Sequence, residues 1–346
     1  MKKIHPNLIS ILAISVFISA CGSAVLAENT RTEFVLGTVC SVKLIQGGDD
    51  KTLDEVFARL RAIDDRMSAN KDGTEIAAVN KAAGLQGAAG AVKVSDDTFY
   101  VISKALEYAR LTQGVFDPSV GPLVKLWNIG TEGASVPPAK SIAAALKLID
   151  WKKVTLDPAA KTVRLASAGM RLDLGAIAKG YSADECSRIL HAHKVKAAII
   201  DLGGNVLVFG KKKDGSSWKI GVQNPDDERG SFIGLVSGFD VTVVTSGIYE
   251  RFFIQDGVRY HHILDTKTGF PVDNGLKSVT IIAESSTDAD GLSTSVFALG
   301  KDKGLELVKS LKDVEAIIVD TRNRVWLSPG AGKVFKLTDT KYSLAE

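Results

Sequence analysis

An aspartate and a threonine four residues apart, Asp290 and Thr294, supply the oxygen atoms that a hard cation requires. They lie near the start of a predicted helix, where residues four apart project from the same face. Magnesium prefers oxygen ligands and usually keeps waters or substrate phosphates, so two side chains and one backbone carbonyl can complete its protein ligand set. The alternative is an aspartate in the dipole-favoured first turns and a threonine that packs its methyl group. The spacing alone favours that alternative.

A second candidate site combines a carboxylate, a glycine turn and a lysine in the sequence LDLGAIAKG at 172–180. Asp173 precedes the turn, and Lys179 lies one turn into the helix that follows. Lys179 can offer positive charge to a diphosphate, and the start of the helix offers backbone donors. A lysine on a solvated helix face is the alternative. The segment is not a P-loop, because the Walker spacing is absent.

Two adjacent histidines, His261 and His262, lie in the sequence YHHILD at 260–265. Successive strand residues point to opposite faces, so at most one of them enters a site. That histidine can act as a base near neutral pH, and a pair of hydrogen-bonded structural histidines is an equal alternative. Zinc is disfavoured, because no cysteine or third histidine is nearby.

Three short segments combine small residues with groups that a ligand can contact. TSG at 245–247 ends a predicted strand and provides two hydroxyls beside a permissive glycine. GGN at 203–205 allows a hairpin turn or the close approach of a ligand to the backbone, and the hairpin is the commoner case. The proline and glycine loop at 114–123 displays one aromatic ring and one carboxylate. An ordinary connection buried under Trp127 explains that loop equally well.

The elements that must position these groups are predicted from hydrophobic periodicity. Helical spacing indicates an amphipathic helix over 53–67, and a Ser95 cap followed by two aspartates predicts a helix that stops at Gly114. Further helices are predicted over 141–149, 176–193 with an interruption at Gly180, 287–299 and 301–311. Strands are predicted over 197–201, 205–209, 218–223, 232–236, 241–245, 251–254, 278–283, 316–320 and 324–327. This order indicates an α+β fold, in which a largely antiparallel sheet has flanking helices.

The first residues have the order of an export signal, with two lysines, an apolar run over 8–18 and then small residues. The run is shorter than the roughly twenty residues of a spanning helix, which disfavours a transmembrane anchor. ISAC at 18–21 resembles a bacterial lipobox. This predicts a lipoprotein signal peptide over 1–20, lipidation of Cys21 and a flexible tether over 21–32. VLA at 25–27 is a competing site for ordinary signal peptidase.

We expect an exported protein, lipid-anchored to the periplasm-facing side of a bacterial inner membrane. Residues 33–346 contain no linker and are expected to form one domain or two intimately packed lobes. Cys40 and Cys186 can pair in an oxidising space if the fold brings them close, but two buried free thiols are favoured. Without the lysines at positions 2 and 3 the formal net charge of +3 falls to about +1, so no nucleic-acid partner is indicated.

Taken in order, these segments resemble the FAD:protein FMN transferase family, the ApbE-type flavin transferases. The resemblance covers nearly the whole chain after the predicted signal. The matching blocks are LGT at 36–38, residues 64–68 and 75–80, the 114–123 loop with Trp127, LDLGAIAKG at 172–180, TSGIYER at 245–251, HILDTKTG at 262–269 and ADGLST at 289–294. Several blocks in sequence order are more specific than any single block.

The resemblance implies the two-lobed architecture of that family, magnesium, and FAD as substrate and bound ligand. The implied metal ligands are the Ala176 carbonyl, Asp290 and Thr294, and the implied catalytic residues are His262 and Asp290. The residues implied to contact FAD are Leu36, Gly37, Thr38, Asn70, Val115, Phe116, Asp117, Asp173, Lys179, Thr245, Ser246, Gly247, His262 and Ile263.

The implied reaction is attack by a threonine or serine hydroxyl of an acceptor protein on the FMN phosphorus of FAD, with AMP as the leaving group. The implied acceptors are flavoprotein subunits of membrane redox complexes. A magnesium-dependent FAD pyrophosphatase, in which water replaces the hydroxyl, is one alternative. A non-catalytic lipoprotein that binds flavin is another.

Three departures from the family pattern bear on these alternatives. Asn70 stands where family members often carry an aromatic residue that stacks on the isoalloxazine ring, which keeps the pyrophosphatase alternative open. Leu36 replaces the usual methionine, a mild change because the volume is nearly conserved. Thr266 replaces the usual proline and loosens its loop.

Overall fold

The computed structural model describes residues 29–345, so the predicted signal peptide over 1–20 lies outside the described residues. Cys21 and residues 21–28 of the predicted tether lie outside them too. The remainder of the tether prediction is wrong, because residues 29–32 begin a paired strand, β1 (Asn29–Val35). Between residues 29 and 345 no helix is both long and apolar enough to cross a membrane.

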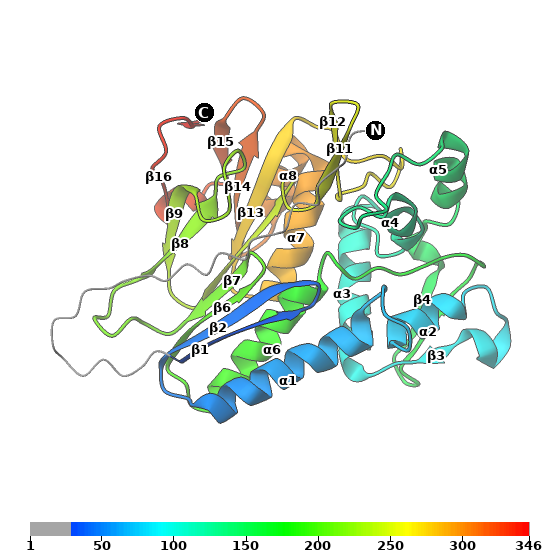
Figure 1. The fold of residues 1–346 in the computed structure, drawn as a ribbon, viewed down its shortest axis with the longest axis horizontal. Coiled ribbons are helices and arrows are strands. Elements are labelled where there is room, and N and C mark those ends of the chain that lie inside the picture. Colours follow the sequence, from blue (N-terminus) through cyan, green and yellow to red (C-terminus); the bar gives the residue numbers. More distant parts are fainter. Residues whose placement is uncertain (1–28, 346) are drawn as a thin grey trace, which may run out of the picture.

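A nine-stranded sheet runs through the molecule (Figure 1). In spatial order its strands are β1, β2 (Thr38–Gln46), β6 (Ala197–Leu202), β7 (Asn205–Phe209), β10 (Val241–Gly247), β13 (Leu276–Ala283), β14 (Glu315–Asp320), β15 (Arg324–Leu327) and β17 (Ser343–Leu344). All neighbours are antiparallel except β15 and β17, which are parallel. The predicted α+β fold with a largely antiparallel sheet is confirmed.

The two faces of this sheet are covered by different partners. On β14, Ile318 packs among helical residues, whereas its neighbours Ile317 and Val319 pack toward a small second sheet. This alternation follows from the two-residue period of a strand. The second sheet consists of β16 (Phe335–Leu337), β9 (Phe232–Gly238) and β8 (Trp218–Gln223).

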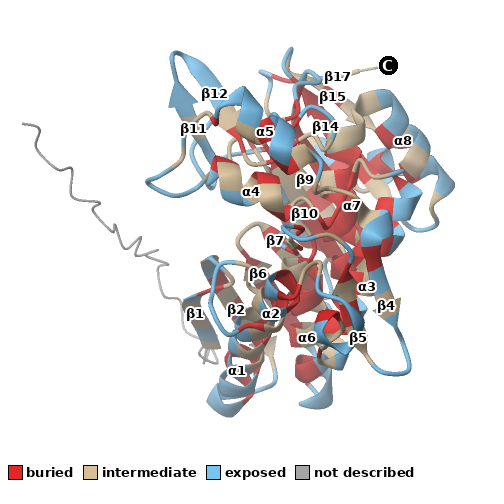
Figure 2. Cartoon of the chain, turned by 90° about the vertical axis from the view of Figure 1, so that its right-hand side faces the viewer, coloured by how far each residue is buried: buried red, intermediate tan, exposed pale blue. Residues whose placement is uncertain are grey.

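Five longer helices supply the opposite layer and carry much of the core. They are α1 (Asp50–Met67), α3 (Asp96–Leu111), α6 (Ala178–Ala192), α7 (Ser286–Leu299) and α8 (Lys301–Ser310). Helix α7 packs against β10 and β13, and α6 packs against α1, α7 and β6. Buried residues concentrate along α3, α6 and α7 (Figure 2). The predicted Ser95 cap of α3 is confirmed, since its hydroxyl accepts from the Thr98 amide.

The remaining elements are short. They are α2 (Glu75–Lys81), α4 (Gly121–Trp127), α5 (Ala139–Leu146), the 3-10 turns Gly87–Gly90, Trp151–Lys153 and Ala331–Lys333, the sheet of β3 (Val92–Lys93), β5 (Thr162–Leu165) and β4 (Val154–Asp157), and the hairpin of β11 (Phe252–Gln255) and β12 (Val258–His261). The helix predicted over 141–149 is wrong in its bounds, because α5 begins and ends earlier. Strands before residue 197 were not predicted at all.

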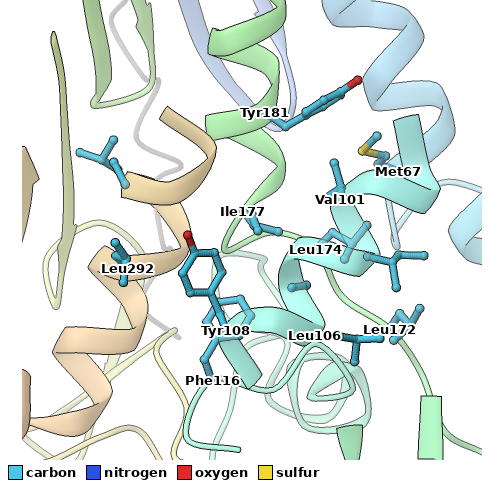
Figure 3. Packing of buried hydrophobic residues seen from close by; sticks show 14 of the residues in the cluster. Met67, Val101, Leu106, Tyr108, Phe116, Leu172, Leu174, Ile177, Tyr181 and Leu292 are labelled. Atoms are coloured by element: carbon cyan, nitrogen blue, oxygen red, sulfur yellow. The ribbon is translucent and has the colours of Figure 1, made fainter. Parts of the chain in front are cut away.

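One hydrophobic cluster joins α1, α3, α6 and α7 (Figure 3). Tyr108 of α3 lies edge-on to Phe116 at a centroid distance of 6.0 Å, and a Cβ at Gly291 of α7 would come within 2.7 Å of the Tyr108 ring. A separate cluster contains Cys40 and Cys186, which are buried and free, as the favoured prediction had it. Burial raises the pKa of the Cys40 thiol to about 12.

Candidate active site

A cavity of about 1080 Å³ opens between the β1–β2 hairpin, the 114–118 loop, the start of α6, the end of β10 and helix α7. The predicted site residues that line it are Leu36, Gly37, Thr38, Asn70, Val115, Phe116, Asp117, Asp173, Ala176, Lys179, Thr245, Ser246, His262, Ile263, Asp290 and Thr294. Gly247 does not line it. Gly247 is buried at the end of β10, where a Cβ would come within 2.5 Å of the Tyr249 ring, so its glycine serves packing.

Helices α6 and α7 touch at Gly180 and Asp290. The Gly180 amide donates to Asp290 Oδ2 at 2.9 Å. A Cβ at Gly180 would lie 2.2 Å from the Ser286 carbonyl oxygen and 2.7 Å from the Asp290 Cβ, so only glycine permits this approach. The predicted interruption of the helix at Gly180 is wrong, because α6 runs from Ala178 through it. This residue sets the spacing between the two helices.

The same contact leaves the carbonyl of Ala176 without its usual hydrogen-bond donor. In an uninterrupted helix the Gly180 amide would bond to the carbonyl four residues earlier, which is that of Ala176. Because the amide donates to Asp290 instead, the Ala176 carbonyl accepts no hydrogen bond from any residue within 29–345. Ala176 lines the cavity, so its unpaired carbonyl oxygen is a candidate atom for binding a ligand.

The other carboxylate oxygen of Asp290, Oδ1, lies 3.8 Å from Lys179 Nζ, and both residues line the cavity. Lys179 Nζ also reaches the Gly175 carbonyl at 3.4 Å. One turn further along α7, Thr294 Oγ1 lies 3.2 Å from Ser246 Oγ on β10. A carboxylate, a carbonyl and two hydroxyls therefore come from three separate elements onto one wall.

This donor set suits magnesium and not zinc. Its atoms are all oxygens, which hard cations prefer, and the cavity leaves room for waters or phosphates in the remaining positions. Over residues 29–345 no group of three or more His, Cys, Asp or Glu side chains is placed to hold a metal. The residues that would hold the ion are Asp290, Thr294 and Ala176 through its carbonyl.

The two histidines are separated as the strand alternation requires. His261 is buried, pairs through Nε2 with the Val272 carbonyl at 2.9 Å and packs edge-on to Phe297. His262 lines the cavity, with Nδ1 3.3 Å from the Arg251 carbonyl. Burial and the positive charge of Arg251 lower the pKa of His262 from its ordinary 6.5 to about 3, so its imidazole is neutral at physiological pH.

The two predicted acidic residues Asp117 and Asp173, which also line the cavity, differ in what their oxygens do. Asp117 is buried, with Oδ1 accepting from the Ser119 amide and hydroxyl and Oδ2 from the Trp151 amide. It therefore holds the shape of the loop that carries Phe116. Among residues 29–345 the Asp173 side chain accepts only from the Gly175 amide, at 2.8 Å, and burial raises its pKa.

The β1–β2 hairpin and the loop after α1 form the rim of the cavity. Leu36 and Gly37 both have positive φ, 57° and 68°, as a tight two-residue hairpin turn requires. The Gly37 carbonyl accepts from Arg251 at 3.3 Å. Asn70 is exposed on the loop after α1, where its backbone N–H donates to Ser68 Oγ at 3.3 Å.

Two parts of the cavity lining were not predicted from the sequence. The 225–229 loop lines the cavity with three acidic residues, although it lies far from the matching blocks and carries no motif. Asn205 also lines it, yet GGN was weighed only as a turn or a close approach. The turn prediction for the glycines is confirmed, since Gly203 and Gly204 turn between β6 and β7 with φ of 65° and 94°. A Cβ at Gly203 would come within 2.2 Å of the Thr38 hydroxyl, and the close approach of a ligand stays a prediction.

Comparison with known proteins decides the family. The sequence model of the ApbE family matches residues 36–318. The chain belongs to the ApbE family.

Named relatives agree with this membership. The chain is 38% identical to an FAD:protein FMN transferase of Treponema pallidum, with 94% of each chain covered, and 38% identical to one of Klebsiella pneumoniae, with 86% of this chain and 91% of the relative covered. The crystal structure of the ApbE protein of Thermotoga maritima superimposes with a TM-score of 0.77 at 32% identity, covering 90% of this chain and 97% of that one. The predicted ApbE-like fold is confirmed.

Proposed function

We propose that the chain is a magnesium-dependent FAD:protein FMN transferase that moves FMN from FAD onto a threonine or serine hydroxyl of an acceptor protein. The observation that carries the proposal is the α6–α7 contact. It brings the Asp290 carboxylate, the Lys179 ammonium and the free Ala176 carbonyl onto one wall of a cavity large enough for a dinucleotide. Membership of the ApbE family and the names of the relatives support the same activity.

In this reaction the acceptor oxygen forms a bond to the FMN phosphorus, the bond between that phosphorus and the bridging oxygen breaks, and AMP leaves. Catalysis of such transfers depends on positioning and charge neutralisation. Magnesium, when bound, would neutralise and orient the diphosphate. Lys179 is placed to offset charge on the phosphate oxygens, and Phe116 belongs to the wall against which the flavin would pack.

His262 is our candidate for the acceptor of the hydroxyl proton. Its neutral imidazole has a free ring nitrogen, because only Nδ1 has a partner among the described residues. A pKa of about 3 makes a weak base in the unliganded protein. The negative charge of a bound diphosphate would raise that pKa and so strengthen the base.

We further propose that the protein is exported and anchored by a lipid on Cys21, and that its acceptors are flavoprotein subunits of membrane redox complexes. The order of residues 1–27 supports export, and ISAC at 18–21 supports lipidation. Mass spectrometry of the mature protein tests this. A diacylglyceryl-modified N-terminal cysteine is expected, and an unmodified N-terminus at residue 28 would contradict it.

A magnesium-dependent FAD pyrophosphatase is the second candidate function. Asn70 favours it, because an exposed amide on the cavity rim cannot stack on the flavin as an aromatic ring would. The deciding experiment incubates the protein with FAD, magnesium and an acceptor flavoprotein subunit. A gain of one FMN in acceptor mass and ultraviolet-excited fluorescence on a denaturing gel are expected. Release of free FMN and AMP without acceptor labelling would support the pyrophosphatase instead.

A further inference from the structure

Three side-chain polar atoms within residues 29–345 are buried without a hydrogen-bond partner: Asn205 Nδ2, Tyr249 Oη and Ser278 Oγ. A buried polar group without a partner destabilises a folded protein, so each one calls for an explanation. Asn205 and Tyr249 line the cavity, whereas Ser278 does not. Two of the three unpaired atoms therefore belong to residues at the place where a ligand can complete their hydrogen bonding.

The orientation of the Asn205 amide follows from its contact with Ser286. Ser286 Oγ donates to Asn205 Oδ1 at 2.7 Å. Thr242 Oγ1 lies 3.1 Å from Ser286 Oγ and 3.3 Å from the Val206 carbonyl oxygen, so its single proton has two acceptors within reach. With Oδ1 paired to Ser286, Nδ2 is the donor left without a partner among residues 29–345.

Asn205 lies beside the stripe of α7 that carries the proposed metal ligands. Ser286, Asp290 and Thr294 recur every four residues and share one helix face. The Asn205 side chain contacts the first of them, which is one helical turn, about 6 Å along the axis, from Asp290. In the sheet Asn205 pairs with Val244, the residue before Thr245.

We propose that Asn205 Nδ2 donates a hydrogen bond to a phosphate oxygen of the FAD diphosphate, an inference that rests on the placement of the diphosphate in the proposed function. A neutral amide can bind a phosphate oxygen without competing with the cation for Asp290. A second lysine at this position would compete, because its positive charge would also be attracted to Asp290. The donor is held in place by Ser286 before the ligand arrives. It therefore presents an oriented donor to the charge that develops on the transferring phosphoryl group.

Substitution of Asn205 tests the contact, with Ser278→Ala as a matched control because it removes a buried unpaired group away from the cavity. Calorimetric titration with FAD and excess magnesium is expected to give a Kd about tenfold higher for Asn205→Ala. Asn205→Asp should raise the Kd further. It keeps an acceptor for Ser286 but presents a carboxylate oxygen to the phosphate. Ser278→Ala should bind FAD as wild type does.

A comparison of ligands separates a phosphate contact from a change in cavity shape. ADP carries the diphosphate without flavin, and riboflavin carries the flavin without phosphate. Asn205→Ala should weaken ADP and FAD binding by similar factors and leave riboflavin binding unchanged. Equal losses for riboflavin and FAD would overturn the inference, as would unchanged FAD affinity, which would assign Nδ2 to a buried water.

The two proposals fail in different ways. A wild-type protein that neither binds nor converts FAD in the presence of magnesium refutes the proposed function. Normal transfer by the wild type, together with wild-type FAD affinity in both well-folded Asn205 variants, refutes only the amide contact. Circular dichroism and thermal unfolding of each variant establish that it is folded.

Discussion

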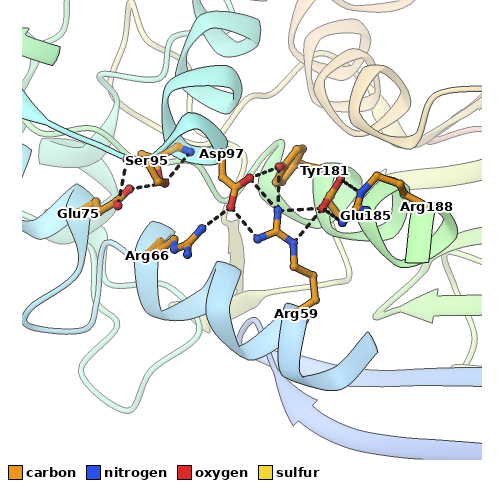
Figure 4. Close-up of polar contacts among 9 residues, drawn as sticks. Arg59, Arg66, Glu75, Ser95, Asp97, Tyr181, Glu185 and Arg188 are labelled. Atoms are coloured by element: carbon orange, nitrogen blue, oxygen red, sulfur yellow. Dashed lines mark hydrogen bonds and ion pairs between the residues drawn. The ribbon is translucent and has the colours of Figure 1, made fainter. Parts of the chain in front are cut away.

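Helix α6 takes part in two charged clusters that differ in how completely their groups are paired. The first cluster, centred on Asp97, joins α1, α3 and α6 (Figure 4). Asp97 accepts from both terminal nitrogens of Arg59 at 2.7 Å, from the Tyr181 hydroxyl at 2.7 Å and from Arg66. Arg59 also donates to Glu185 at 2.9 Å. Each charged group in this cluster has a partner.

The second cluster joins α6 and α7 and is incompletely paired. Lys179 and Asp290 are 3.8 Å apart, beyond an ordinary hydrogen bond. The Ala176 carbonyl and Asn205 Nδ2 have no partner within residues 29–345. Since a folded protein satisfies nearly all of its buried polar groups, the difference separates a cluster that holds helices together from the one that we propose binds the FAD diphosphate.

Asp290→Ala should lower magnesium-dependent FMN transfer by about a thousandfold or more, equivalent to about 4 kcal/mol, because it removes the only carboxylate among the proposed metal ligands. Steady-state transfer rates across a magnesium titration measure the effect. Asp302→Ala, on the exposed start of α8, is the control and should keep wild-type rates. Transfer by Asp290→Ala at the wild-type rate would exclude this aspartate from the mechanism.

Arg59→Ala should lower the free energy of unfolding by about 3 kcal/mol, because it leaves two half-buried carboxylates, Asp97 and Glu185, with fewer partners. Urea unfolding measures this change. Arg188→Ala removes a more exposed arginine that pairs with Glu185, and it should cost about 0.5 kcal/mol or less. FAD affinity should stay unchanged in both folded variants. A large loss of FAD affinity in Arg59→Ala without a loss of stability would contradict the purely structural role of the Asp97 cluster.

His262→Ala should slow transfer about a hundredfold and change FAD affinity far less, because the imidazole is proposed to accept a proton and not to bind the substrate. Single-turnover transfer rates and FAD titrations measured on the same preparation separate the two effects. Equal losses in rate and affinity would place His262 among the binding residues instead.

Acid should weaken the paired cluster in a defined window. The Arg59 hydrogen bonds lower the pKa of Asp97 from its ordinary 3.8 to about 2. A carboxylate with a lowered pKa stabilises the fold above its ordinary pKa and loses that contribution as the pH falls through its folded value. Because Asp97 is partly exposed and solvent screens its ion pairs, wild type should therefore exceed Asp97→Asn in stability by about 1 kcal/mol more at pH 6 than at pH 2. A stability difference that does not change with pH would contradict this cause.

Local pattern was enough to predict the elements with strong periodicity. The apolar spacing of 53–67 and the Ser95 cap located α1 and α3, and the β-branched runs after residue 196 located most strands of the main sheet. The β1–β2 hairpin was missed because residues 29–32 of β1 were assigned to the tether and no strand was predicted over 38–46. The short β3, β4 and β5 strands were missed because so few residues carry too little periodicity.

Sequence alone determined which residue types were available and that the motifs follow the order found in one enzyme family. Each motif is a short run of neighbouring residues, so it can be recognised without knowledge of the fold. The tertiary structure decided that the Gly180 amide meets Asp290 across 110 residues, which frees the Ala176 carbonyl. It also decided that Asn205 Nδ2 is a donor without a partner among residues 29–345, and that the Asp117 carboxylate accepts hydrogen bonds from the Ser119 and Trp151 amides. Such outcomes depend on which distant elements pack together, and hydrogen-bond satisfaction cannot be counted until every neighbour is in place.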